Sequence, residues 1–144
     1  MTTQDQTVIT VAATVNAPID IVWKAWTNPS DIKKWNAASD DWHTPTAEND
    51  LRPGGKFSSR MEARDGSFGF DFDGIYDEVI TNELISYTLG DQRKVKITFE
   101  KNTEGVKITE SFDAENTNPI EMQRGGWQAI LDNFKKYVES SRNF

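Results

Sequence analysis

The order of the predicted elements constrains the fold of this chain more than any other feature of its sequence. One β-patterned segment and two short helical segments are followed by about six further β-patterned segments, and one long amphipathic helix ends the chain. Such an order predicts an α+β fold in which a curved antiparallel sheet is covered mostly by the last helix. Because one helix cannot fill a strongly curved sheet, we expect an apolar cavity of roughly 300 to 1,000 Å³ between them.

The first strand and the two short helices follow from hydrophobic periodicity. Residues 8–15 alternate apolar and polar side chains, which is the period of a half-buried strand. From residue 18 the apolar side chains recur at helical spacing until Asn28-Pro29 ends the helix. Ser30 can cap a second short helix that carries Ile32 and Trp35 on one side.

Turn residues divide the middle of the chain into strands. The proposed strands cover approximately residues 42–48, 57–64, 68–80, 84–89, 95–99 and 106–112. Gly74 takes the place of an inward side chain between Phe72 and Tyr76, which predicts a bulge, a sharp bend or a close backbone approach. With the first segment, the predicted sheet has six to seven strands.

The last helix begins at Asn118-Pro119, a cap residue followed by a proline at the first helical position. Its apolar face consists of Trp127, Ile130, Leu131, Phe134 and Val138. Gly125 and Gly126 lie inside the helix and each costs about 1 kcal/mol relative to alanine, so we expect a kink or tight packing there.

Composition limits the classes of function. The 144 residues are sufficient for one domain, 1–144, with a core of about 8–140, and they include no cysteine for a disulfide or a thiolate metal site. A formal net charge of -7 disfavours nucleic acids and anionic membranes as partners. The N-terminus lacks the pattern of a secretory signal, so we expect a cytoplasmic protein. We also expect a monomer or weak dimer with no stable membrane association.

Several segments, in this order, resemble one known family. They are 16–19, 22–27, Trp35, the run Asp50-Leu51-Arg52-Pro53-Gly54-Gly55-Lys56-Phe57, 74–79 and Gly126-Trp127. The chain is similar to the activator of heat-shock protein 90 ATPase homologue-like (AHSA-type) group of the START-like, or SRPBCC, birch-allergen-like helix-grip superfamily. The resemblance covers about residues 8 to 140 and implies the helix-grip fold. Because this superfamily includes lipid carriers, hormone receptors, cyclases and co-chaperones, the fold alone does not assign the function.

We expect a binding domain for a small hydrophobic or amphipathic molecule, such as a lipid, a polyketide or a flavonoid-like aromatic, with no cofactor and with a possible link to stress response. Aromatic and apolar side chains would line the cavity together with one carboxylate. The expected ligand-binding residues are Trp35, Trp42, Phe57, Phe70, Phe72, Tyr76, Tyr87, Phe99, Glu110, Phe112, Trp127, Leu131 and Phe134.

Glu110 is the most informative of these residues. It shares the parity of Val106, Ile108 and Phe112 and should therefore point towards the interior. Its partner would be an arginine, Arg52 or Arg60, or a tyrosine hydroxyl. Without a partner, desolvation would raise its pKa, which is the condition for a general base. Arg60 and Glu62 would themselves orient a ligand only if the Ser59 face of their strand points outward.

Other polar groups suggest weaker alternatives. His43 lacks a spaced second metal ligand, so we expect an ordinary role near a strand start. Asp71, Asp73 and Asp77 share the parity opposite the phenylalanines and are interpreted as a solvated strand face. The Arg52-Pro53-Gly54-Gly55 run lacks the ending of a phosphate-binding loop and predicts a tight turn.

Two other functions stay open at this stage. The resemblance implies a chaperone-cofactor type of protein interaction, with a chaperone as the partner. A cyclase or hydrolase type of enzyme would need Glu110 and a positioned second acid or base, which the sequence does not identify. We therefore favour a binding domain over an enzyme and expect no catalytic or metal-ligating residues.

Overall fold

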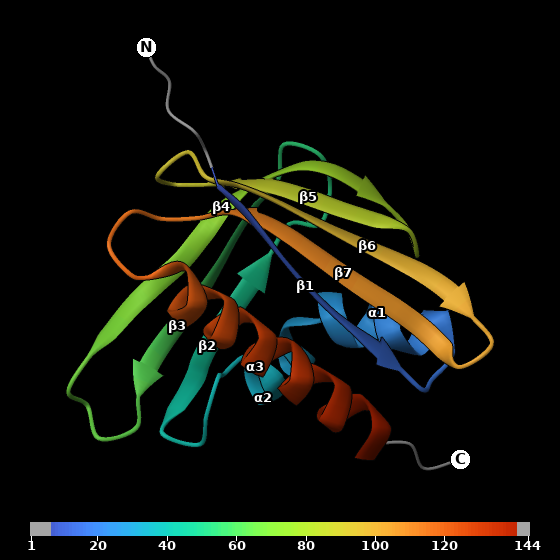
Figure 1. Cartoon of the computed structure of the whole chain (residues 1–144), viewed down its shortest axis with the longest axis horizontal. Helices are drawn as coiled ribbons and strands as arrows, with labels where there is room; N and C mark the ends of the chain where they lie inside the picture. Colours follow the sequence, from blue (N-terminus) through green and yellow to red (C-terminus); the bar gives the residue numbers. More distant parts are fainter. Residues whose placement is uncertain (1–6, 141–144) are drawn as a thin grey trace.

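The computed structural model describes residues 7–140, which form one curved antiparallel sheet and three helices (Figure 1). The elements are, in chain order, β1 (Val8–Val15), α1 (Ile19–Thr27), α2 (Pro29–Trp35), β2 (Trp42–Asn49), β3 (Lys56–Ala63), β4 (Gly69–Ile80), β5 (Leu84–Leu89), β6 (Lys94–Asn102), β7 (Gly105–Asp113) and α3 (Ile120–Ser140). The α+β helix-grip prediction is confirmed: α3 lies across the concave side of the sheet.

The sheet has the strand order β1-β7-β6-β5-β4-β3-β2, and all neighbouring strands are antiparallel. Strands β2 to β7 form a meander, whereas β1 pairs with the last strand, β7, from Val8↔Asp113 to Val15↔Val106. The chain therefore passes from one edge of the sheet to the other through α1 and α2. These two short helices close one end of the concave side.

Helix α3 is attached to the β1 edge of the sheet. The Gln128 side-chain amide donates to the Ala12 carbonyl at 3.1 Å, and Lys135 Nζ donates to the Thr14 carbonyl at 2.6 Å. The backbone N–H of Asn16 donates to Glu139 Oε2 at 2.8 Å. These contacts hold the helix along β1, so its other side faces the strands in the middle of the sheet.

The core fills the end of the fold where α1, α2 and the C-terminal half of α3 meet. Phe134 is fully buried and packs edge-on against Trp26 and Trp35, with ring centroids 4.8 and 4.9 Å apart. Phe99 contacts Trp26 from the sheet, and Trp35 Nε1 donates to the Ala25 carbonyl at 2.8 Å. The aromatic rings therefore pack solidly at this end.

The glycine predictions have mixed outcomes. A Cβ at Gly74 would lie 2.5 Å from the Thr88 carbonyl oxygen, which confirms the close backbone approach. The register shift of β4 lies further along, between Tyr76 and Glu78. The expected tight packing at Gly125 and Gly126 is wrong, because a Cβ at either position would meet no atom within 4 Å. Helix α3 continues through both residues.

The Arg52-Pro53-Gly54-Gly55 run forms the predicted turn and connects it to β4. Gly54 has a φ of 85°, and its N–H donates to the Tyr76 carbonyl at 2.8 Å. The N–H of Tyr76 in turn donates to the Gly55 carbonyl at 2.9 Å, and the N–H of Gly55 donates to the Arg52 carbonyl. One of these hydrogen bonds closes the turn, and the other two join it to Tyr76 of β4.

No helix within residues 7–140 combines the length and the apolar character needed to cross a membrane.

Candidate ligand-binding cavity

A cavity of about 430 Å³ lies between the N-terminal half of α3 and the concave side of the sheet. Its volume falls in the range of small-molecule sites. The cavity reaches the surface beside Met122 of α3 and Phe70 of β4, which are 63% and 40% exposed. A buried end, formed by residues such as Trp35 and Ile85, and an open end therefore belong to one space.

Alternating residues of several strands form the sheet wall of the cavity, which is mostly apolar. Strand β3 contributes Phe57, Ser59 and Met61, and β5 contributes Ile85 and Tyr87. The rings of Phe57 and Tyr87 meet edge-on at 4.6 Å. The strand period of two therefore brings residues that are distant in sequence to one surface.

Nine of the expected ligand-binding residues lie on the cavity wall: Trp35, Trp42, Phe57, Phe70, Phe72, Tyr76, Tyr87, Glu110 and Trp127. The wall also contains residues that the sequence did not single out as ligand-binding, among them Arg93, Glu115, Met122, Gln123 and Gly126. Contact of any of them with a ligand stays a proposal.

The other four expected residues, Phe99, Phe112, Leu131 and Phe134, do not line the cavity. Leu131 and Phe134 are fully buried where α3 meets the short helices, and Phe99 packs with Trp26. Phe112 lies behind the wall because Trp127 stacks on it, with ring centroids 3.8 Å apart. The predicted inward direction of these four side chains is thus correct, but their position along the fold puts them in the core.

Glu110 on β7 is the only acidic residue of the described chain that is buried on the wall; it is 5% exposed. On the two neighbouring strands its direct partners are Val11 and Ile97, both buried. Among residues 7–140, no side chain or backbone group forms a hydrogen bond or an ion pair with the Glu110 carboxyl. Desolvation accordingly raises the pKa of Glu110 from 4.5 to about 8.

Two tyrosines share this surface. Burial raises the pKa of Tyr87 well above 10, and the nearby Glu110 charge raises it further. Burial also raises the pKa of Tyr76 to about 12, although a hydrogen bond with Asn49 opposes this shift. The Tyr87 hydroxyl has no hydrogen-bond partner in the part of the chain that the structure describes. Three polar groups on this wall, Glu110, Tyr87 and the buried Ser59 hydroxyl, have no hydrogen-bond partner within residues 7–140 and are therefore left for another partner.

The arginines that were candidates for Glu110 lie elsewhere. Arg60 is on the outer face of β3, where its guanidinium contacts Glu62 at 2.9 Å and Asp71 at 3.3 Å. Because Ser59 is buried and lines the cavity, Arg60 and Glu62 point away from it and cannot orient a ligand there. Arg52 pairs with Asp50 at 2.8 Å in the exposed turn.

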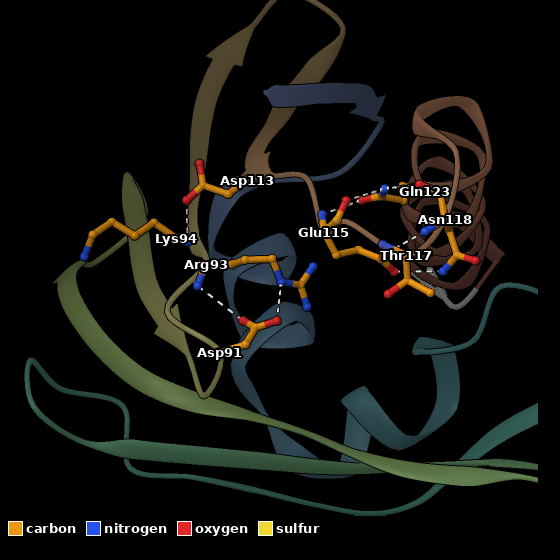
Figure 2. Close-up of polar contacts among 8 residues, drawn as sticks. All are labelled: Asp91, Arg93, Lys94, Asp113, Glu115, Thr117, Asn118 and Gln123. Atoms are coloured by element: carbon orange, nitrogen blue, oxygen red, sulfur yellow. Dashed lines mark hydrogen bonds and ion pairs between the residues drawn. The ribbon is translucent and has the colours of Figure 1, made fainter. Parts of the chain in front are cut away.

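Arg93, which follows the turn between β5 and β6, is the cation that does reach the wall (Figure 2). Its Nε donates to Asp91 Oδ2 at 2.7 Å, which fixes the guanidinium. Figure 2 shows that the two terminal guanidinium nitrogens of Arg93 point toward Glu115. Within residues 7–140, these nitrogens form no hydrogen bond. No sequence pattern identifies Arg93 as a wall residue, because the position of its guanidinium depends on the hydrogen bond to Asp91 in the turn.

The connection between β7 and α3 is held by its own hydrogen bonds. Glu115 Oε1 accepts from the N–H groups of Thr117 and Asn118 at 2.7 and 2.8 Å, and these bonds lower the pKa of Glu115. The Gln123 amide accepts from the N–H of Glu115 at 2.9 Å and donates to the Asn118 carbonyl at 2.8 Å (Figure 2). These groups fix the start of α3 at the cavity mouth and are already satisfied.

The other polar groups considered from sequence lie outside the cavity. His43 is on β2, with Nε2 3.9 Å from Glu62 Oε1. Asp71, Asp73 and Asp77 are exposed on β4, as predicted. Within residues 7–140 no group of three or more His, Cys, Asp or Glu side chains has an arrangement that could hold a metal ion.

Comparisons with known proteins agree with this architecture. The profile of the family described as "Activator of Hsp90 ATPase homolog 1-like protein" matches residues 16–139. The solution structure of an AHSA1-like protein from Aeromonas hydrophila is 43% identical, covers 94% of either chain and has a TM-score of 0.88. A solution structure from Cytophaga hutchinsonii is 52% identical over 94% of this chain and 96% of that chain, with a TM-score of 0.80.

Solved structures of lower sequence identity share the fold. A crystal structure from Nitrosomonas europaea is 19% identical, covers 92% of this chain and 94% of its own, and has a TM-score of 0.79. No curated protein matches the sequence. Since the family profile covers most of the sequence, the chain belongs to the family of activator of Hsp90 ATPase homolog 1-like proteins.

Proposed function

We propose that this protein binds a small, largely apolar molecule in the cavity between α3 and the sheet. The fold and family support a ligand-binding or an Hsp90 co-chaperone-like role in general. The observation that favours ligand binding is the cavity itself: about 430 Å³, with an aromatic wall that includes a buried carboxyl group with no partner in residues 7–140. A domain that only docked on another protein would not need such an interior.

The apolar wall would supply most of the affinity. Each 100 Å² of apolar ligand surface removed from water contributes about 2.5 kcal/mol. The rings of Phe57 on β3 and Phe72 on β4 contribute to the sheet wall, and Trp127 on α3 contributes to the helix wall. Rigid aromatic walls lose little conformational entropy when a ligand binds.

Two glycines of α3 provide a test with a matched control. Gly126 lines the cavity, whereas Gly125 is exposed and does not. A Cβ at either position would meet no atom within 4 Å, so a side chain can start at both without a clash at its Cβ. Only Gly126→Leu extends a side chain into the cavity, and both substitutions favour the helix equally.

The probe is N-phenyl-1-naphthylamine, whose fluorescence increases in apolar surroundings. We expect saturable 1:1 binding to the wild type and to Gly125→Leu, and at least about tenfold weaker binding to Gly126→Leu. Chemical-shift changes at the indole N–H of Trp127 would place the probe in the cavity. Equal binding by both variants, or no saturable binding by the wild type, would argue against this function.

A further inference from the structure

The polar groups on the cavity wall differ in whether the protein already satisfies them. The Glu115 carboxylate and the Gln123 amide take part in the hydrogen bonds that fix the start of α3. Within residues 7–140, by contrast, the Glu110 carboxyl and the Tyr87 hydroxyl form no hydrogen bond, and Arg93 keeps its outer nitrogens free. A ligand would therefore meet these three groups and the buried hydroxyl of Ser59, which also forms no hydrogen bond within residues 7–140, as its polar contacts.

We propose that the cavity selects an apolar ligand carrying a carbonyl oxygen, which accepts hydrogen bonds from Glu110 as a neutral carboxylic acid and from the Tyr87 hydroxyl. This inference rests on the proposed function and deepens it by naming the chemical class of the ligand. Glu110 is the anchor on β7, and Tyr87 lies on the same cavity wall on β5, with β6 between the two strands.

The surroundings of Glu110 favour the neutral acid. Val11 and Ile97 flank it on both sides within the sheet, and it is 5% exposed. In the described chain, no lysine, arginine or histidine nitrogen lies within 4.0 Å of its carboxylate oxygens. An ionised carboxylate in such a place would be unpaired and costly, whereas the protonated group supplies an O–H donor. The raised pKa of about 8 agrees with this reasoning.

The available polar groups of the wall each carry a hydrogen that they can donate to a ligand. A tyrosine hydroxyl and a protonated carboxyl each offer one O–H, and the outer guanidinium nitrogens of Arg93 only donate. A cationic amine would require Glu110 to ionise and would share the cavity with the positive charge of Arg93, while the Glu115 carboxylate on the same wall already accepts the N–H groups of Thr117 and Asn118. An acceptor oxygen satisfies the buried groups without either cost.

The proposal also predicts a pH dependence. Besides Glu110, the titratable groups on the wall are Tyr76, Tyr87, Arg93 and Glu115. The pKa of Tyr76 is raised to about 12, that of Tyr87 lies well above 10, and that of Glu115 is lowered. Arginine stays protonated. A change in affinity between pH 7 and 9 would therefore report the loss of the Glu110 proton.

Three compounds of nearly equal shape test the proposal: benzophenone, which has the carbonyl; diphenylmethane, which lacks it; and diphenylmethylamine, which is a cation at pH 7. Binding to the wild-type protein is measured by NMR chemical-shift titration at pH 6, 7 and 9. We expect benzophenone to bind about tenfold more tightly than diphenylmethane at pH 6 and 7. This advantage should shrink by pH 9, while the affinity for diphenylmethane stays constant.

Variants separate the donor role from packing. Glu110→Gln retains an N–H donor, so the benzophenone advantage should persist to pH 9. Glu110→Leu removes the donor, and benzophenone should then bind only as well as diphenylmethane. Tyr87→Phe keeps the ring and should reduce the advantage severalfold, without changing diphenylmethane binding.

The failures of the two proposals are distinguishable. If diphenylmethane and benzophenone bind equally at pH 6, the cavity binds apolar molecules but the carbonyl inference is wrong. Tightest binding of diphenylmethylamine, with an affinity that rises with pH until the amine loses its proton, would instead identify a carboxylate site for cations and overturn the inference. If none of the three compounds binds, the proposed function falls and the inference falls with it.

Discussion

The buried carboxyl of Glu110 should make the stability of this protein decrease with pH. Its pKa is about 8 in the folded protein, against a reference of 4.5 for the exposed group. Between these values the folded state keeps a proton that the unfolded state has lost. The contribution is therefore complete below pH 4.5 and disappears as the pH approaches 8. The full interval corresponds to about 5 kcal/mol, at about 1.4 kcal/mol per pH unit.

Glu110→Gln removes this titration while keeping the shape of the side chain. Urea denaturation, followed by tryptophan fluorescence at pH 5, 6 and 7, gives the free energy of unfolding of both proteins. We expect the free energy of unfolding of the variant minus that of the wild type to increase by about 1.4 kcal/mol for each pH unit. Glu100→Gln makes the same side-chain change at an exposed position on β6 and should keep the wild-type slope.

A constant difference between wild type and Glu110→Gln from pH 5 to pH 7 would refute the reasoning. It would mean that Glu110 is solvated or paired in solution, and the neutral acid would then not be available to a ligand. If the free energy of unfolding of the variant minus that of the wild type decreased with pH, the pKa of Glu110 would be lowered by folding instead of raised. The fold would then stabilise the ionised carboxylate.

Two further predictions concern glycines. Gly125→Ala and Gly126→Ala should each raise the free energy of unfolding by about 1 kcal/mol, measured by urea denaturation, because both lie inside α3 with no atom within 4 Å of an added Cβ. Gly55→Ala should lower it by about 2 kcal/mol or more, since the new Cβ would lie 1.9 Å from the Asp50 carbonyl oxygen and would displace the turn that holds Tyr76; an unchanged thermal midpoint would contradict this.

Strand parity is sufficient to place Glu110. Val106, Ile108, Glu110 and Phe112 alternate with polar residues, and an unbroken register turns all four side chains to the same face. The same argument places Phe57 and Tyr87 on the inner face. Periodicity works here because each strand has one buried and one solvated side, so a shift by one residue would expose the core.

Periodicity does not tell how far the cavity extends along an element. Leu131 and Phe134 share the apolar face of α3 with Trp127, but they lie in the half of the helix that α1 and α2 cover. Arg93 belongs to no periodic pattern, because Asp91 fixes its guanidinium across a turn. The division of the inner face into core and cavity depends on tertiary packing, which local patterns do not encode.

Packing also explains why the space stays open at one end. Hydrogen bonds from Gln128 and Lys135 hold α3 along β1, and Trp127 stacks on Phe112 at the β7 wall. One residue before Trp127, the helix presents Gly126 to the cavity, where an alanine would add a methyl group and stabilise the helix by about 1 kcal/mol. A core that served stability alone would gain from such a residue. Helix stability and access to the cavity are therefore opposed at position 126, and glycine favours access.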